Sequence, residues 1–539
     1  MRLRRPDVPT LLAFGSALAW MGAVYAAYFS GANTFEFGQY AEIGRNILAG
    51  HGFTTRVLYP STLAALDGLG LARLEYTPVD HRFPLPAFLS ALSQALLGET
   101  DFAAAAPTMV LFAAWVALAY AAAARWLGRR EAALGAALFA AVPAGAKYFV
   151  LFTLPDVPFG ALLFAFHWML AEARPEDGRR RCAALGALGG LLYLCRFNFW
   201  VWLPLYAVVL WRTLGPRGRV RGLATFFGAF ALVCAPAVLY KLRWFGALGT
   251  PDVAWNLAHQ TTSADQPWLA FRTFSSAEVL SSAWRAVAAK SLDHLHTLLL
   301  EGPMLWQLQA LIPFTALGLL RWPEGTARRF LALNLAALAW QAVAFAPLRF
   351  DSWGLGVGYR YFFWVCPLLV FLGLRGVVAL VESLPEKARL PALGAWLALH
   401  AAFVVPFYTH DLTSIHVDHP SGLPPRQWPE LAWLAGRANA GEGVVSNLPA
   451  QVGWYAGVSA VALPNDPEDV PKMAAVRPLR YLFVSTLNIG TLGDLPKWLD
   501  LLRPNLDGLN RYCAAHGYRT AAVMPGAVIL DLKPAPENP

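Results

Sequence analysis

The sequence predicts a multi-spanning α-helical membrane protein with a C-terminal α/β domain outside the membrane. Of its 539 residues, 57% are hydrophobic and only 14% are charged, and the mean hydropathy is +0.44. In a typical soluble chain about a quarter of the residues are charged. The apolar residues gather in long runs, and short basic clusters separate these runs. This pattern excludes an ordinary soluble globular protein and a disordered chain.

Apolar runs that suit a membrane span recur along the first 407 residues. Because a span needs about 20 residues, we expect eleven of them. They are 11–29, 103–124, 132–149, 157–172, 182–195, 198–211, 223–240, 303–320, 330–347, 359–380 and 391–407. We interpret the block 182–211 as two short helices that turn at Arg196, since one long helix would place one of its flanking arginine clusters outside.

The net charge of +9 indicates the orientation of the chain in the membrane. Residues 408–539 hold 12 acidic and 10 basic side chains, whereas the first 407 residues hold 22 acidic and 33 basic ones. The basic excess lies between the spans, as expected for cytoplasmic loops. We therefore expect a cytoplasmic N-terminus and outer segments at 30–102, 241–302 and 408–539. No nucleic-acid partner is expected, because no basic face with groove-reading elements is evident.

The tail after Pro406 changes to short apolar segments. GVVSN, AVALP, YLFVST and AVILDL predict strands, and the segments between them predict helices. We accordingly divide the chain into a transmembrane domain, residues 1–407, and an α/β domain, residues 408–539. The tail carries no GxGxxG motif or P-loop, so its sequence does not argue for nucleotide binding.

The first outer loop is the most unusual stretch of the sequence. Residues 34–53 have helical periodicity, with Tyr40 on the apolar face and Glu36 at the start. His81 and Arg82 follow, just before an amphipathic run that we expect to lie along the membrane interface.

These motifs resemble the C-type membrane glycosyltransferases that use polyprenyl-phosphate sugars, the family 39 and 83 group. That group includes protein O-mannosyltransferases and the lipid A aminoarabinose transferase. Its first outer loop commonly reads Asp-Glu-x-x-Tyr-Ala-Glu-Ile-x-Arg, and EFGQYAEIGR at 36–45 is similar. The family's basic-Pro-Pro-Leu motif resembles RFPL at 82–85, its later acidic motif resembles LPDVP at 154–158, and its late Arg-Tyr resembles Arg360-Tyr361. Three positions depart from the pattern, and they are Glu36 for Asp, Phe37 for Glu and Phe83 for Pro.

The resemblance implies a GT-C-like fold of about 11 transmembrane helices in a bacterial inner membrane. It also implies transfer of a sugar, with inversion, from a polyprenyl-phosphate donor to a periplasmic lipid, glycan or protein. Such transfer needs a carboxylate for the acceptor's proton and cations for the leaving phosphate. We expect Glu36 and Asp156 as catalytic carboxylates, and Arg82, Tyr40, His81, Arg360 and Lys147 as donor-phosphate or substrate ligands. A divalent cation (Mg or Mn) is left open, with Glu36 and Asp156 as its candidate ligands.

Each candidate has a structural alternative. Glu36 can stabilise a helix N-terminus electrostatically, and Asp156 can cap the next helix. Arg82, Arg360 and Lys147 can extend toward lipid headgroups, and Tyr40 can pack the loop helix. Arg196 is a functional candidate because a charge within an apolar block is costly, although a turn would expose it to water. Two clusters rich in His and Asp, at 293–296 and 410–419, are weaker candidates for contacting a phosphate, an acceptor or a metal.

Two other functions are compatible with the sequence. A lipid-linked transporter or flippase would place charges deep in its spans and break helices in two matched halves, and only Arg196 and Arg375 come close to this pattern. A non-catalytic scaffold whose tail binds a partner would be favoured if Glu36 and Asp156 lay far apart.

Overall fold

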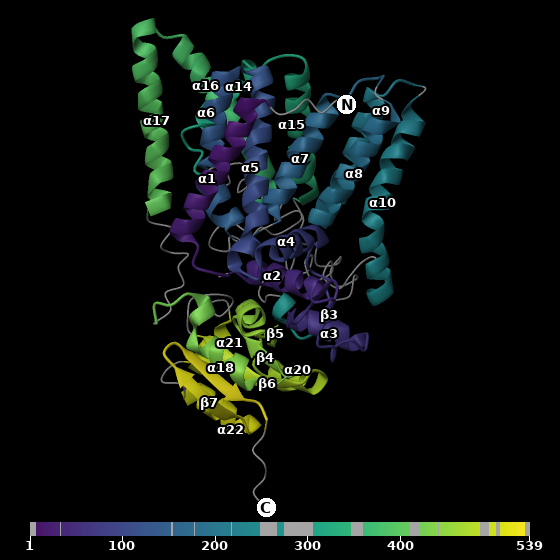
Figure 1. Cartoon of the computed structure of the whole chain (residues 1–539), viewed down its shortest axis with the longest axis vertical. Coiled ribbons are helices and arrows are strands. Elements are labelled where there is room, and N and C mark those ends of the chain that lie inside the picture. The colour runs from purple at the N-terminus through teal and green to yellow at the C-terminus, as the bar shows by residue number, and fades with distance from the viewer. Residues whose placement is uncertain are drawn as a thin grey trace, which may run out of the picture.

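The computed structural model describes residues 7–32, 34–151, 153, 155–176, 178–216, 218–247, 267–273, 306–345, 359–409, 421–439, 441–485, 495–502 and 507–533. In these residues a bundle of upright helices stands on a smaller α/β unit (Figure 1). Two helices of the first outer loop, α2 (Phe35–Leu48) and α4 (Pro84–Leu97), lie across the boundary between the two layers (Figure 1).

The bundle helices follow the spans predicted from the sequence, and each predicted span overlaps a helix. They are α1 (Val8–Tyr28), α5 (Asp101–Trp126), α6 (Arg129–Ala140), α7 (Asp156–Ala171), α8 (Arg179–Cys195), α9 (Leu203–Thr213), α10 (Arg219–Phe245), α14 (Thr315–Leu320), α15 (Thr326–Phe345), α16 (Cys366–Glu382) and α17 (Glu386–Thr409). Five of the described helical segments are long and apolar enough to cross a membrane: α1, α5, α10, α17 and Arg360–Glu382. The number of eleven spans stays a prediction.

Short 3-10 or π-helical segments precede or follow several of these helices. The expected break at Arg196 is present, because α8 ends at Cys195, Arg196 is extended (φ −152°, ψ 116°), and a 3-10 segment, η2 (Phe197–Trp202), leads into α9. A second 3-10 segment, η6 (Tyr359–Val365), precedes α16, η5 (Ile312–Phe314) precedes α14, and a π-helical segment, η1 (Ala144–Val150), follows α6. Irregular backbone at membrane depth is tolerated where protein or a cavity surrounds it.

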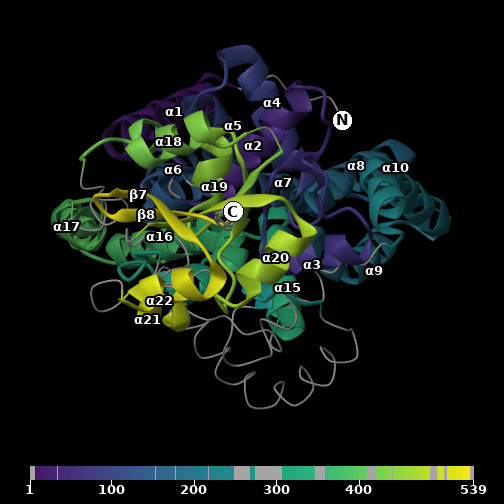
Figure 2. The ribbon, with the colours of Figure 1, turned by 90° about the horizontal axis from the view of Figure 1, so that it is seen from below.

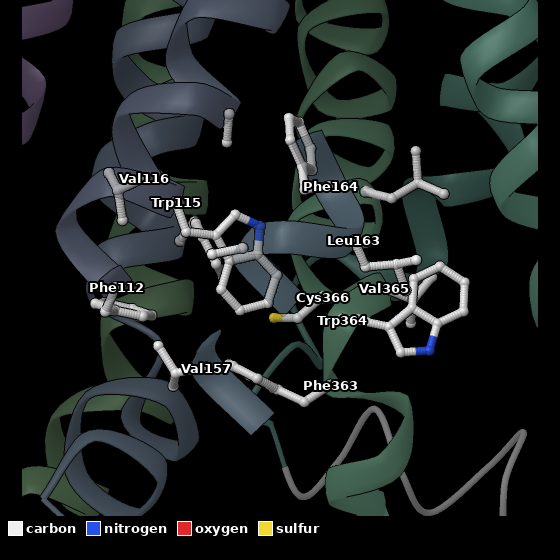
Figure 3. Close-up of a cluster of buried hydrophobic side chains, with 14 of the residues drawn as sticks. Phe112, Trp115, Val116, Val157, Leu163, Phe164, Phe363, Trp364, Val365 and Cys366 are labelled. Atoms are coloured by element: carbon white, nitrogen blue, oxygen red, sulfur yellow. The ribbon is translucent and has the colours of Figure 1, made fainter. Parts of the chain in front are cut away.

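Aromatic rings and small residues build the core of the bundle. Phe112 and Trp115 of α5 lie in one cluster with Phe363 of η6 (Figure 3), and the Trp115 and Phe363 ring centroids are 5.7 Å apart in an edge-on arrangement. Gly160 of α7 makes room for the indole, since a Cβ there would lie 2.2 Å from the Trp115 ring. This packing fixes η6 against α5 and α7.

The helices α14 and α16 cross in direct backbone contact. A Cβ at Gly318 would lie 1.8 Å from the Leu372 carbonyl oxygen, and a Cβ at Gly376 would lie 2.0 Å from the Phe314 carbonyl oxygen. Small residues of this kind let membrane helices approach closely.

The α/β unit is built on a six-stranded sheet in the order β2-β5-β4-β6-β8-β7. Strands β2, β5, β4 and β6 are parallel, whereas β8 and β7 run antiparallel to their neighbours. The strands are β2 (Val57–Leu58), β4 (Gly443–Ser446), β5 (Ser459–Ala462), β6 (Leu479–Ser485), β7 (Arg519–Met524) and β8 (Ala527–Asp531). The helices around them, seen from below in Figure 2, are α18 (Pro429–Arg437), α19 (Pro449–Gln451), α20 (Asp469–Val476), α21 (Pro496–Leu502) and α22 (Asp507–His516).

The four predicted strands correspond to β4, β5, β6 and β8. The sheet, however, also includes a strand from residues 1–407, the predicted transmembrane domain. Its edge strand β2 comes from the first outer loop and pairs with β5, with Val57 opposite Ala460. The same loop also forms a two-stranded sheet, β1 (Thr54–Thr55) with β3 (Thr77–Pro78), and the helix α3 (Pro60–Gly68). The outer loop and the tail therefore form one folded layer under the bundle.

Hydrogen bonds join residues of the tail to both ends of the helix α2. The Arg45 guanidinium donates to the carbonyl oxygens of Gly453 at 2.7 Å and Trp454 at 3.0 Å. Gln451 donates to the Ala32 carbonyl oxygen at 2.9 Å, just before α2 begins. Both ends of α2 are thus held by the tail.

Some predicted features lie outside the described residues. They are the clusters 293–296 and 410–419 and most of the outer segment 241–302. Lys147 lies in η1, but its side chain is also outside the described part of the structure.

The α14–α16 crossing makes a prediction about stability. Gly376→Ala should lower the free energy of unfolding by about 1–3 kcal/mol, the usual cost of overpacking, because its methyl group has no room beside Phe314. Thermal unfolding in detergent measures this loss. Gly394→Ala on α17 is the matched control, since no atom lies within 4 Å of a Cβ there. Equal stability of the two variants would contradict the tight crossing.

Candidate active site

Glu36 lies in the first turn of α2, where Thr34 caps the helix by accepting a hydrogen bond from the Phe37 amide at 3.2 Å. Its carboxylate binds Arg360 through two hydrogen bonds, of 2.8 Å to Oε2 and 3.0 Å to Oε1. Arg82 contacts Oε1 at 3.4 Å. The expected stabilisation of the helix N-terminus and an ion-pair role therefore coexist at Glu36.

The two arginines determine the protonation state of Glu36. Burial alone would raise the pKa of this carboxyl, but the charges of Arg360 and Arg82 more than offset burial and lower the pKa to about 2. A two-pronged, charge-assisted guanidinium–carboxylate pair is among the strong hydrogen-bonding arrangements in proteins. Glu36 is consequently an anion at every physiological pH.

A chain of hydrogen bonds fixes Arg82 from its other side. Its Nε donates to Gln39 Oε1 at 2.7 Å, and Gln39 Nε2 lies 2.6 Å from His81 Nε2 and 2.9 Å from the Val57 carbonyl oxygen. Since the Gln39 oxygen accepts from Arg82, its nitrogen is the donor, so His81 Nε2 accepts and carries no proton. Burial and the charge of Arg82 hold the pKa of His81 well below its ordinary value. His81 is therefore neutral and supports Arg82 through Gln39.

A second ion pair lies where α7 and α8 meet. Arg196 Nη2 is 2.9 Å from Asp156 Oδ1, and both side chains are almost fully buried. The ring of Tyr361 lies 4.3 Å from the Arg196 guanidinium, and it also contacts Arg360. The predicted capping role of Asp156 is wrong, because Pro155 occupies the cap position and no side chain caps the helix.

The two ion pairs form one cluster. Asp156 interacts electrostatically with Arg360 and Glu36, and Glu36 interacts with Arg196. The three guanidinium groups of Arg82, Arg196 and Arg360 outnumber the two carboxylates, which leaves a formal charge of +1. We call these five residues the arginine cluster.

Polar atoms of the arginine cluster retain hydrogen-bonding capacity. Within the described part of the chain, the buried Nε groups of Arg196 and Arg360 and both oxygens of Asp156 form no hydrogen bond of acceptable geometry. Buried polar groups are almost always satisfied, so such atoms require an explanation. A net positive cluster with unused N–H donors suits an anion such as a phosphate.

The structure brings together most of the residues predicted for the site. Glu36, Asp156, Arg82, Arg360 and His81 join the cluster or its support. Tyr40 is buried beneath Arg82, with its ring centroid 5.7 Å from the guanidinium carbon, and its hydroxyl accepts from the Phe83 amide at 3.4 Å. Tyr40 therefore packs and orients the loop.

The possible divalent cation is not favoured by this arrangement. Glu36 and Asp156, its candidate ligands, are each paired with arginine. Among the residues that the structure describes, no group of three or more His, Cys, Asp or Glu side chains could hold a metal ion.

Sequence reasoning missed Gln39 and left Arg196 outside the predicted ligands. Gln39 follows Glu36 by three residues, so the two share a helix face, and this spacing was the available signal. Arg196 was visible as a charge in an apolar block, but its carboxylate partner lies 40 residues earlier and could not be read from spacing.

Comparisons with known proteins find one matching family model and solved structures of similar fold. The family model described as dolichyl-phosphate-mannose-protein mannosyltransferase matches residues 80–240, which include Arg82, Asp156 and Arg196. No curated protein sequence matches the chain. Crystal structures of ArnT from Cupriavidus metallidurans are similar in fold, and each alignment covers 98% of this chain and 99% of the ArnT chain. The TM-score is 0.53 at 13% identity for ArnT bound to undecaprenyl phosphate and 0.52 at 14% identity for its apo state.

The fold is thus that of ArnT, and the chain is a multi-pass membrane protein. The resemblance predicted from the outer-loop motifs is confirmed: this chain is similar to the C-type glycosyltransferases that use polyprenyl-phosphate sugars.

Proposed function

We propose that this protein transfers a sugar from a polyprenyl-phosphate donor to an acceptor in the bacterial periplasm, where the arginine cluster faces the outer leaflet of the inner membrane. The observation that carries the proposal is the convergence of Arg82, Arg196 and Arg360 on Glu36 and Asp156. The structure of ArnT with undecaprenyl phosphate supports a donor of this class. The acceptor is a lipid, a glycan or a protein, and its nucleophile is a hydroxyl group.

The donor phosphate would compete with Glu36 for the arginines. A phosphate presents oxygens that match a planar guanidinium in two-pronged geometry, and it offers more negative charge than a carboxylate. As Arg360 and Arg82 turn to the phosphate, Glu36 loses part of the positive electrostatic potential that keeps its pKa low. Donor binding would thereby turn a weak base into a stronger one.

The transfer step is then a single displacement. The acceptor oxygen forms a bond to the anomeric carbon while the bond from that carbon to the phosphate oxygen breaks. The acceptor proton passes to Glu36, and the electron pair of the broken bond remains on the phosphate, which the arginines stabilise. Polyprenyl phosphate leaves, and the configuration at the anomeric carbon is inverted. Asp156 holds Arg196 in place throughout.

Removing the proposed base gives the first test. Glu36→Gln should lower the rate of sugar transfer by at least about 100-fold, the lower range for loss of a general base. Transfer from defined polyprenyl-phosphate sugars to membrane extracts measures this rate.

Glu131→Gln is the matched control for Glu36→Gln. Glu131 also accepts a 2.8 Å hydrogen bond from an arginine, Arg375, but outside the arginine cluster. Full activity of Glu36→Gln, or equal losses in both variants, would remove Glu36 from the mechanism.

Replacing a guanidinium by an ammonium tests the phosphate contact. Arg360→Lys keeps the charge but loses the two-pronged geometry, so the KM for the donor should rise about tenfold or more. Steady-state kinetics with varied donor give this value. Arg375→Lys, made on the same span, should leave the donor KM unchanged. A donor KM that is insensitive to Arg360→Lys would argue against phosphate binding at Arg360.

The pKa of Glu36 makes a prediction about pH. Because the folded pKa, about 2, lies below the ordinary value of 4.5, the ionised form stabilises the protein above about pH 4.5, and this stabilisation is lost as the pH falls toward 2. The difference in Tm between the wild type and Glu36→Gln should stay constant from about pH 5 to 8 and shrink below about pH 4.5. A difference that changes near neutral pH would contradict the ion pair.

A further inference from the structure

The helix α15 makes polar contacts with both 3-10 segments next to the arginine cluster. Arg196 immediately precedes η2, and Arg360 is the second residue of η6. On η2, the Trp202 indole donates to the Ala337 carbonyl oxygen at 3.2 Å, and the Trp340 indole donates to the Val201 carbonyl oxygen at 2.7 Å. These two bonds fasten η2 to α15.

Gln341 makes the corresponding contacts with η6. Its Nε2 donates to the Tyr361 carbonyl oxygen at 3.0 Å, and its Oε1 accepts from the Trp364 indole at 2.8 Å. The side chain is completely buried. A buried amide on a membrane helix is costly unless both its donor and its acceptor are paired, and these two contacts pair both groups of Gln341.

The contact at Tyr361 connects Gln341 to two guanidinium groups. Arg360 is the residue before Tyr361, and the Tyr361 ring lies 4.3 Å from the Arg196 guanidinium. A 3-10 helix has poorer internal hydrogen bonds than an α-helix, so its position depends on such external contacts. A shift of η6 would move Arg360 away from Glu36 and move the ring away from Arg196.

We infer that Gln341 is a positioning residue for donor binding, because it sets the placement of Arg360 and Arg196 relative to each other. The inference rests on the proposed function and adds a residue that touches neither the phosphate nor the reacting atoms. In this arrangement α15 holds the two arginines at one spacing, at which both can contribute to binding an anion.

The same helix offers a matched control at Asn334. It lies seven residues before Gln341 and is also a buried amide, but its oxygen is 2.9 Å from His167 Nδ1. His167 Nε2 in turn is 2.7 Å from the Tyr206 hydroxyl. This network joins α15 to α7 and α9, and within the described residues the hydrogen bonds of Asn334 do not reach the arginine cluster. Gln341→Leu and Asn334→Leu therefore remove comparable groups with different connections.

The test measures binding of undecaprenyl phosphate to the full-length protein in detergent, together with the Tm of each variant. Gln341→Leu should weaken binding about tenfold, the loss of about one charge-assisted contact, whereas Asn334→Leu should lower Tm without weakening binding. In an Arg360→Lys background, Gln341→Leu should have a smaller further effect than in the wild type, because the part of its contribution that acts through Arg360 is already lost. Trp364→Phe removes the indole N–H that holds the Gln341 amide and should weaken binding several-fold, which keeps the test valid if Gln341→Leu does not fold.

The possible failures are distinguishable. Equal binding by Gln341→Leu and Asn334→Leu, or additive effects of Gln341→Leu and Arg360→Lys, would overturn the positioning role and leave the proposed function standing. A wild-type protein that binds no undecaprenyl phosphate would overturn the proposed function and the positioning role with it.

Discussion

The ion pair between Glu36 and Arg360 is the interaction on which the rest of this structure depends. It joins the first outer loop to the segment before α16, across 324 residues of sequence. Both side chains are largely buried, with 15% of Arg360 and 18% of Glu36 exposed, and a charge in such a place is stabilised by a partner and hydrogen bonds. Arg82, Arg196 and Asp156 complete the cluster and leave it slightly positive. An anion can then replace Glu36 as the partner of the arginines.

The surrounding fold positions the groups of the cluster. The tail holds α2 through Arg45 and Gln451, so Glu36 is placed by the α/β unit as well as by the bundle. The bundle places the arginines through irregular segments, where α8 stops at Cys195 and η6 precedes α16. The sheet that includes β2 makes the first outer loop and the tail one support. The tail, which looks independent in sequence, therefore supports the helix that carries Glu36.

The sequence predicted the helical spans, the break at Arg196 and four of the strands, because hydrophobic patterns and charge placement are local. It did not predict that β2 joins the tail sheet, because two residues such as Val57 and Leu58 carry no pattern of their own. It identified Glu36, Arg82, Asp156 and Arg360 by motif. It could not pair them, since which arginine meets which carboxylate depends on how the helices pack. Gln39 was missed although it lies three residues after Glu36, because an amide at that spacing does not by itself indicate an arginine partner from another part of the chain.

Binding of the phosphate of a lipid-linked sugar by the arginine cluster is central to the proposed function. A structure of the protein with undecaprenyl phosphate, determined by cryo-electron microscopy in lipid nanodiscs, tests it most directly. We expect the phosphate within hydrogen-bonding distance of Arg360 and of Arg82 or Arg196, and the two-pronged contact between Arg360 and Glu36 opened. A phosphate bound elsewhere, with the Glu36–Arg360 pair intact, would contradict the account.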